Sequence, residues 1–418
     1  MAKEQIHMPT SIPQAARLAV AVYFFLTGAT FASWAVRIPA VQTRLGLSPG
    51  ELGVALLGTA AGELVFMNLA GYLAARFGSR FLTVIASVCL SVMLPILALA
   101  PTLPVLVATL MLFGASFGSV NVAMNTQGVA VERCYGRSIF SSFHACYSIG
   151  GLTGALVGGL MATHDIAPLP HFLGVAFLGI ILTLSVAHFL LPAHTDAQGA
   201  RVVVARPTRT LLALGLVAFC VVLGEGAMAD WSAVYLNTIL RTGMGLAAVG
   251  YAAFSIVMAV GRGMGDHLAN RLGPSMMVRL GGLVAAGGLT LALVVNWVPL
   301  ALVGFGLVGA GFSVIFPLTL SAAGRTSKHV SGTAIAAVAT CGYVGFLVGP
   351  AVIGFAANAL NLRVALGVVV LLSLCAAAFA RVVGGSKQAG SGQVLADGER
   401  SFPLGISTER KPKRSSQI

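Results

Sequence analysis

The chain contains twelve apolar runs of roughly 20 residues, the length at which a helix crosses the hydrocarbon core of a bilayer. They lie at about 16–38, 50–75, 80–101, 103–130, 138–163, 170–192, 210–238, 246–268, 275–296, 298–323, 330–358 and 362–384. Hydrophobic residues make up 57% of the 418 residues and charged residues 9%, against about 25% charged residues in an ordinary soluble domain. Because a backbone in lipid must satisfy its polar groups internally, these runs predict an all-α membrane protein with 12 transmembrane helices.

One long polar segment divides the apolar runs into two groups of six, while the other connections are short. We predict a cytoplasmic N-terminal tail at 1–15, an N-terminal six-helix bundle at 16–192, a cytoplasmic linker at 193–209, a C-terminal six-helix bundle at 210–384 and a disordered cytoplasmic tail at 385–418. The last segment has glycines, serines and charges without an apolar period, which is typical of disorder.

The basic residues are distributed unevenly between the two sides of the membrane that the twelve runs define. Of the 25 lysines and arginines, 21 fall on the side of both termini, and only Arg37, Arg44, Arg241 and Arg363 fall on the other side. Cytoplasmic loops carry an excess of Lys and Arg, so both termini are expected in the cytoplasm. Membrane orientation therefore accounts for the net charge of +13, and we expect no nucleic-acid partner.

The two groups of runs repeat each other in the sequence. A shift of 197 residues places Trp34 on Trp231, and a shift of 195 places Arg76-Phe-Gly78 on Arg271-Leu-Gly273. Since six runs separate the copies, both copies begin on the same side of the membrane, and the repeat is parallel. Two parallel six-helix halves are the plan of the major facilitator transporters.

A loop motif carries the same resemblance. Between the second and third runs the chain reads Gly71-Tyr-Leu-Ala-Ala75-Arg76-Phe-Gly78-Ser79-Arg80, which resembles the G-x-x-x-D-R-x-G-R-R loop of that superfamily. The sequence departs from this motif at Ala75 and Ser79. The counterpart from Arg262 to Gly273 keeps an acid and arginines, so the resemblance implies that cytoplasmic gating contacts rest on Arg262, Asp266 and Arg271. The resemblance covers about residues 16–384 and implies the major facilitator fold.

Three further segments resemble a narrower, largely uncharacterised bacterial branch, the YbjJ-like inner-membrane proteins. They are 121–133, 225–232 and 34–39. The resemblance implies a bacterial inner-membrane location and leaves the substrate open. The drug/proton antiporters of the superfamily carry G-x-x-x-G-P in their fifth helix, whereas Gly154 is followed here by Ala155. This difference weakens an export function without excluding it.

Three acids lie within the apolar runs, where an ionised side chain costs roughly 2.5–3.5 kcal/mol and indicates function by default. They are Glu63, Glu225 and Asp230, the proposed proton-coupling residues. Glu225 falls near mid-membrane, and Asp230 lies about 140° away around an ideal helix. A kink at a neighbouring glycine brings the two acids onto one side; otherwise they have separate roles. The alternative for Glu63 is a neutral acid that is hydrogen-bonded to a neighbouring helix.

Arg37 ends the first run on the outer side, and we predict that it pairs with Asp230, directly or through water, as an outer gate. The alternative for Arg37 is an arginine that extends to the membrane interface. For Asp230 the alternative to a proton-coupling role is an ion pair that holds the outer gate. Trp34 and Trp231 lie in the outer parts of repeat-related runs. They are candidates for stacking on a ring of the solute, and the alternative is anchoring at the interface.

Polar side chains in the fourth and fifth runs form a candidate substrate cavity. Asn121 and Asn125 share a face at i and i+4, and His144 and Tyr147 are neighbours at i and i+3. Counted from the cytoplasmic ends, the two pairs lie at matched depth. The alternative is hydrogen bonding between helices, which contributes only about 0.6 kcal/mol per contact.

The sequence shows no P-loop, no HExxH motif, no cysteine–histidine cluster and no nucleophile elbow. We therefore expect neither an enzyme, nor a cofactor, nor a metal site. The prediction is a secondary active transporter that moves a small polar solute, neutral or cationic and including sugar-like compounds, by alternating access coupled to protons. The expected partners are this solute, protons and the lipid bilayer, and the expected state is a monomer. The alternatives are drug efflux by proton antiport and a non-transporting membrane sensor or assembly partner.

Overall fold

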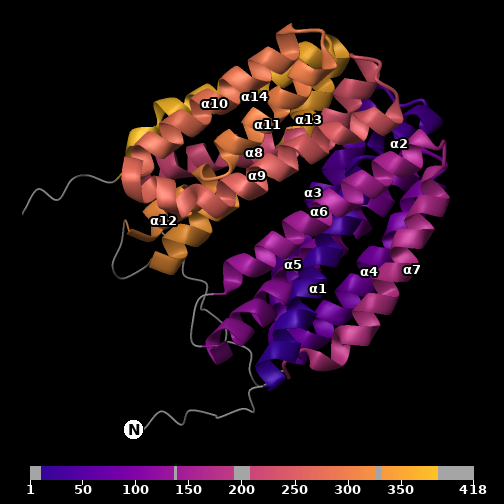
Figure 1. Ribbon diagram of the computed structural model, residues 1–418, viewed down its shortest axis with the longest axis vertical. Helices are drawn as coiled ribbons and strands as arrows, with labels where there is room; N and C mark the ends of the chain where they lie inside the picture. The colour runs from indigo at the N-terminus through magenta and orange to yellow at the C-terminus, as the bar shows by residue number, and fades with distance from the viewer. Residues whose placement is uncertain (1–10, 136–138, 193–207, 326–330, 385–418) are drawn as a thin grey trace, which may run out of the picture. The chain divides into compact units, whose positions relative to one another are not determined.

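Every regular element in the described part of the chain is a helix, so the predicted all-α class is confirmed (Figure 1). The computed structural model describes residues 11–135, 139–192, 208–325 and 331–384. Eleven of the described helices are long and apolar enough to cross a membrane, and Leu362–Ala378 is a shorter apolar helix. The predicted tails and linker lie mostly outside these residues, so the division into domains stays a prediction.

The helices follow the apolar runs to within a few residues. The first half contains α1 (Ser11–Ala35), α2 (Ile38–Leu45), α3 (Pro49–Phe77), α4 (Ser79–Leu99), α5 (Leu103–Tyr135), α6 (Phe140–Thr163), α7 (Pro168–Val186) and the short η1 (Ala187–Phe189). The second half contains α8 (Arg209–Thr238), α9 (Met244–Leu272), α10 (Pro274–Val294), α11 (Val298–Phe312), α12 (Ile315–Arg325), α13 (Ser331–Ala359), α14 (Leu362–Ala378) and η3 (Ala380–Gly384).

The tenth run is one candidate span, Val298–Arg325, with a break inside it. This span agrees with the predicted run at 298–323, but within it α11 ends at Phe312 and α12 begins at Ile315. Ser313 and Val314 lie at the break, and the Ser313 hydroxyl donates to the Ala310 carbonyl at 2.7 Å. A serine that bonds to the backbone of the preceding turn competes with regular helical bonding, which helps to explain a break that hydrophobicity alone does not show.

The repeat in the sequence is also a repeat in backbone geometry. Gly78 separates α3 from α4 with φ 88°, and Gly273 separates α9 from α10 with φ 82°. The Gly78 N–H bonds to the Ala74 carbonyl at 2.8 Å, and the Gly273 N–H bonds to the Ala269 carbonyl at 2.9 Å. Both glycines adopt a conformation that side chains with a Cβ disfavour. This requirement explains why both copies of the loop motif keep a glycine there.

The two halves contact each other mainly through α3 against α13 and α6 against α9. The α3–α13 contact is tightest in the first turns of α3, where a Cβ added to Gly53 would lie 2.7 Å from the Pro350 carbonyl oxygen. Near the other ends of α3 and α9, a Cβ added to Gly71 or Gly263 would meet no atom within 4 Å. The halves therefore pack closely at the end that is opposite to the loop motifs.

Candidate functional site

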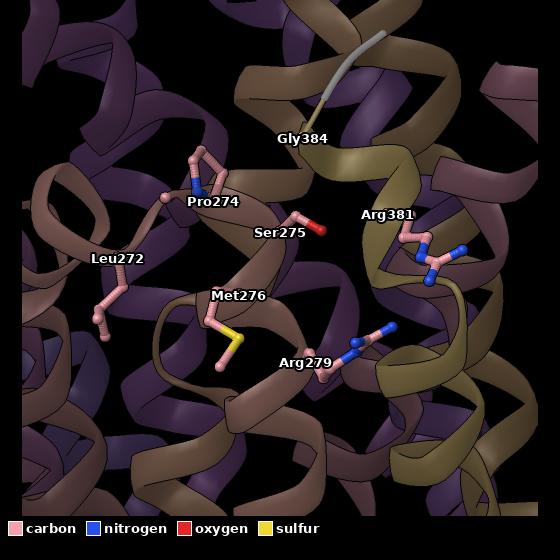
Figure 2. A pocket seen from close by; sticks show the side chains of 8 residues that line it. Leu272, Pro274, Ser275, Met276, Arg279, Arg381 and Gly384 are labelled. Atoms are coloured by element: carbon pink, nitrogen blue, oxygen red, sulfur yellow. The ribbon is translucent and has the colours of Figure 1, made fainter. Parts of the chain in front are cut away.

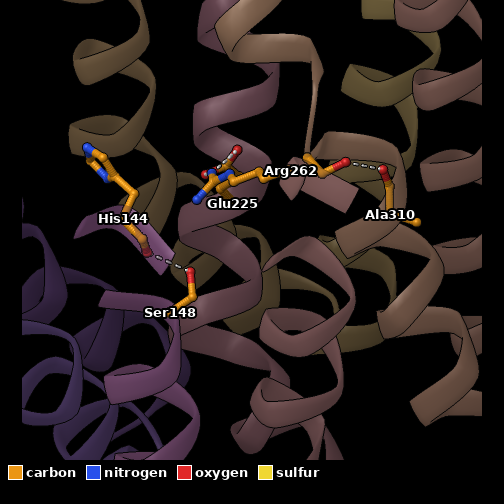
Figure 3. Close-up of polar contacts among 6 residues, drawn as sticks. His144, Ser148, Glu225, Arg262 and Ala310 are labelled. Carbon is orange, nitrogen blue, oxygen red and sulfur yellow. Dashed lines mark hydrogen bonds and ion pairs between the residues drawn. The ribbon is translucent and has the colours of Figure 1, made fainter. Parts of the chain in front are cut away.

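The structure joins Glu225 of α8 to Arg262 of α9 in an ion pair (Figure 3). The Nη2 atom of Arg262 lies 3.2 Å from Oε2 and 3.5 Å from Oε1 of Glu225. The Arg262 side chain is 39% exposed and the Glu225 side chain 24% exposed, so water reaches both. The sequence singled out each residue for a different reason and did not predict that they meet.

Groups from the other half lie within electrostatic range of this pair. The charge of Arg262 acts on His144 and Tyr147 of α6, and the Glu225 carboxylate also acts on Tyr147. His144 lies against Phe24 and Phe140, with ring centroids at 5.1 and 5.2 Å. Two of the predicted cavity residues therefore lie near the Glu225–Arg262 pair, and we refer to these four residues, Glu225, Arg262, His144 and Tyr147, as the central site.

Glu63 of α3 approaches the same region from the first half. Its charge acts on both Tyr147 and Tyr343. The side chain is buried against α5, where a Cβ added to Gly118 would lie 3.0 Å from its Cγ. No hydrogen bond or ion pair joins the Glu63 carboxyl to another residue in the described part of the chain. The structure therefore does not contain the neighbouring-helix hydrogen bond that we considered as an alternative.

The predicted direct ion pair between Arg37 and Asp230 is not formed among the described residues. Arg37 is buried and donates from Nη2 to the Ile166 carbonyl, while its Nε and Nη1 atoms have no partner there. Asp230 is also buried, and its charge acts on Tyr251 of α9. The electrostatic neighbour that the structure gives Arg37 is His171 of α7. A pair through water stays a prediction.

Trp34 and Trp231 lie in the protein core. The first is 1% exposed and the second is fully buried. Neither indole therefore reaches the surface of the protein, as interfacial anchoring would require. In this conformation neither ring is accessible to a solute.

Asn121 and Asn125 keep their polar groups within α5. The Asn125 amide donates to the Asn121 carbonyl at 2.7 Å, and both side chains are half-buried. Asn125 also lines a cavity of about 260 Å³ near the end of α5, together with Arg133. The described residues give neither asparagine a hydrogen bond to another helix, so the alternative role between helices is not observed.

Gln127 makes the contacts between helices instead. Its Nε2 donates to the Ser79 hydroxyl at 2.7 Å and to the Leu191 carbonyl at 2.9 Å, and its Oε1 accepts the Leu191 N–H at 3.0 Å. Glu132 has a comparable structural role, because it accepts the Ile139 and Phe140 N–H groups at 2.7 Å. Both residues stabilise the end of the first half that carries its loop motif.

The loop-motif residues differ in their surroundings. Gly71 and Arg76 are exposed, and Arg76 donates to the Tyr72 hydroxyl at 2.9 Å. Arg80 is half-buried, and Arg271 is exposed. The side chain of Asp266 lies outside the described residues. Arg262 bonds to Glu225, and its role in loop gating stays a prediction.

The family follows from comparison with known proteins. The sequence profile of the Major Facilitator Superfamily matches residues 18–350. The chain belongs to this superfamily. The predicted membership is thereby confirmed, and the members matched below are described as transporters.

Relatives and solved structures agree with this membership. An uncharacterised MFS-type transporter of Yersinia pestis is 38% identical over 362 residues, which cover 86% of this chain and 94% of that protein. The nucleoside transporter NupG has a TM-score of 0.73 at 12% identity, covering 88% of this chain and 98% of that one. A bacterial homologue of the human lysosomal transporter Spinster, solved inward-facing and occupied, has a TM-score of 0.72 at 16% identity, covering 90% and 97%. The two solved structures show the fold alone.

The sequence did not predict two features of the site. The charges of Asp230, Glu225 and Arg262 act on Tyr251, and Arg262 pairs with Glu225. A signal for Arg262 was present, because it lies inside the apolar run 246–268, where a charged residue needs a partner. Tyr251 gave no comparable signal, since a tyrosine in an apolar helix is most often a packing residue. The described residues contain no group of three or more His, Cys, Asp or Glu that would hold a metal ion.

Proposed function

We propose that this protein is a secondary active transporter that moves a small polar solute by alternating access, driven by protons. The observation that supports the proposal most directly is the partly exposed Glu225–Arg262 pair, which lies within electrostatic range of His144 and Tyr147 of the other half. A charged side chain within a membrane helix costs free energy, and the cost is largest when the charge has no partner. An ion pair between two such helices therefore indicates a functional role. A solute that displaces one partner, or a proton that neutralises Glu225, breaks this contact and therefore alters the packing of α8 against α9.

The balance of charges favours a neutral or cationic solute. The three acids Glu63, Glu225 and Asp230 outnumber the two arginines proposed to act with them, Arg37 and Arg262, and Arg262 already has a carboxylate partner. A second carboxylate or phosphate from a solute would face uncompensated negative charge. A neutral solute with several hydroxyl or amine groups would instead find hydrogen-bond partners in Tyr147 and Glu225.

Proton coupling is assigned to Glu225, aided by Asp230 or Glu63. Protonation of Glu225 removes the negative charge that Arg262 binds, which releases Arg262 for the solute or for another acid. A membrane potential of 100 mV adds about 2.3 kcal/mol per charge moved, which corresponds to roughly fiftyfold accumulation. The close packing of α3 on α13 at the end away from the loop motifs corresponds, in the proposed orientation, to a closed outer side. That orientation places both termini in the cytoplasm of a bacterium with the protein in its inner membrane.

The test uses proteoliposomes that contain the purified protein and the pH-sensitive dye pyranine. A panel of sugars, polyols, amines and amino acids is added outside, and a change of lumen pH identifies a solute that moves with protons. That solute is then measured with and without an imposed pH gradient. Glu225→Gln is expected to abolish gradient-driven accumulation while exchange of solute without a gradient survives, because the shape and one hydrogen bond remain.

The matched control is Asp165→Asn, an equal loss of one carboxylate at an exposed loop position between α6 and α7. The control is expected to accumulate solute as the parent does. Gradient-driven accumulation by Glu225→Gln at the parental level would refute the coupling role, and Glu63 and His144 would be tested next. Absence of flux for every solute of the panel would favour the sensor or assembly function instead, and proton movement opposite to the solute would favour efflux by antiport.

A further inference from the structure

A second pocket lies away from the central site, where η3 packs against the first turn of α10 (Figure 2). Its volume is about 380 Å³, and Arg279, Arg381 and Ser275 contribute the polar groups of its lining. Figure 2 shows both guanidinium groups and the Ser275 hydroxyl around the same space. The lining residues include no acid.

Both arginines of this pocket lack a protein partner. Neither Arg279 nor Arg381 forms a hydrogen bond or ion pair with another residue in the described ranges, and both side chains are exposed. By contrast, the nearby Arg325 donates to the Ser321 hydroxyl at 2.7 Å and to the Val383 carbonyl at 3.3 Å. Arg325 therefore fastens η3 to α12 and stabilises the pocket wall, while Arg279 and Arg381 leave their donors available to a ligand. Two guanidinium groups with free donors match the geometry of a phosphate group.

The surface beside the arginines is apolar and continues along α10. Met276 is 45% exposed, Leu280 38% and Leu283 48%. Their spacing of four and three residues places them on one face of the helix. In a membrane-spanning helix this exposed face contacts acyl chains. A ligand that fills the pocket and follows this face therefore has an anionic head and an apolar tail.

We propose that this pocket binds the phosphate headgroup of an anionic glycerophospholipid, with its acyl chains along Met276, Leu280 and Leu283. The pocket lies at the membrane face where the loop motifs and the ends of the chain are expected, which is the cytoplasmic leaflet in the proposed orientation. Basic pockets at this face bind anionic headgroups in other membrane proteins. The site is separate from the Glu225–Arg262 pair and does not depend on the transport proposal.

The experiment measures lipid binding to the full-length protein in a neutral detergent. Native mass spectrometry gives the dissociation constant for phosphatidylglycerol, with phosphatidylcholine as the zwitterionic reference. Each arginine near a membrane surface contributes about fivefold in affinity, so Arg279→Gln with Arg381→Gln is expected to weaken phosphatidylglycerol binding by about thirtyfold. Phosphatidylcholine binding is expected to stay unchanged. The control is Arg241→Gln with Arg363→Gln, which removes the same charge from the opposite end of the bundle.

Two further measurements distinguish a lipid headgroup from a free phosphate ion and control for misfolded variants. Inorganic phosphate and glycerol 3-phosphate are added in place of lipid, and stabilisation by these ions equal to that by phosphatidylglycerol would overturn the lipid assignment. The unfolding temperature in phosphatidylcholine is compared for all variants. Where the double variant unfolds early, the single variants Arg279→Gln and Arg381→Gln are each expected to show the fivefold loss. Equal phosphatidylglycerol affinity in the parent and in these variants would refute the proposal.

Discussion

The Nη2 atom of Arg262 faces both carboxylate oxygens of Glu225, 3.2 Å from one and 3.5 Å from the other. The two residues are 37 positions apart and lie on consecutive, antiparallel helices of the second half. The pair converts two isolated charges into one neutral unit inside a membrane helix bundle. Because the pair is partly exposed, a proton or solute can reach it without unfolding either helix.

The first prediction concerns the energetic coupling of this pair. Arg262→Gln and Glu225→Gln each leave one charge without its partner, whereas the double variant removes both charges. We expect the double variant to lose about 1 kcal/mol less free energy of unfolding than the two single variants lose together. The difference is small because water screens the pair. Thermal unfolding of the four proteins in one detergent measures this coupling. Additive losses would mean that the contact does not contribute to stability.

The second prediction concerns the outer gate. Arg37 bonds to the Ile166 carbonyl, and two of its guanidinium nitrogens are buried without a partner in the described chain, so the closed outer side leaves it poorly compensated. If Asp230 compensates this charge through water, both Asp230→Asn and Arg37→Gln destabilise the closed outer side. Each is expected to increase by several-fold the labelling rate of a cysteine introduced at Ala248, which is buried in the first turns of α9 against Gly159 of α6, with Asp165→Asn as the control. Unchanged labelling in both variants would refute the gate.

Hydrophobicity and the repeat predicted the helices because both depend on local sequence. Each apolar run contains at least one helix of the structure, and the 195-residue shift predicted that Gly78 and Gly273 occupy equivalent places. Contacts between side chains depend on helix rotation, which one sequence does not specify. This is why the sequence did not predict that Arg262 of α9 pairs with Glu225 of α8. The burial of Trp34 and Trp231 was missed for the same reason, because the sequence locates each ring along its helix but does not give the direction in which it points.

The third prediction concerns topology. The excess of 21 basic residues against 4 predicts that His194–Arg209 and both termini are cytoplasmic. A reporter that is active only in the cytoplasm, fused at residue 200 or at the C-terminus, is expected to be active in both fusions. The matched fusion at Asp165, between α6 and α7, is expected to be inactive. An external signal at residue 200 or at the C-terminus would contradict the orientation.

The fourth prediction concerns Gln127, whose amide holds the Ser79 hydroxyl and both backbone groups of Leu191. Gln127→Leu keeps the volume but removes all three hydrogen bonds, and the Leu191 N–H and carbonyl then lose this partner in a buried place. A buried polar group left unsatisfied costs about 1–3 kcal/mol, so the variant is expected to unfold several degrees below the parent. The control Gln14→Leu makes the same exchange at an exposed position of α1 and is expected to leave the unfolding temperature unchanged. The role of Gln127 is structural, so the apparent affinity for the transported solute is expected to stay at the parental value in the folded variant. Loss of solute affinity without loss of thermal stability would instead place Gln127 in the transport pathway.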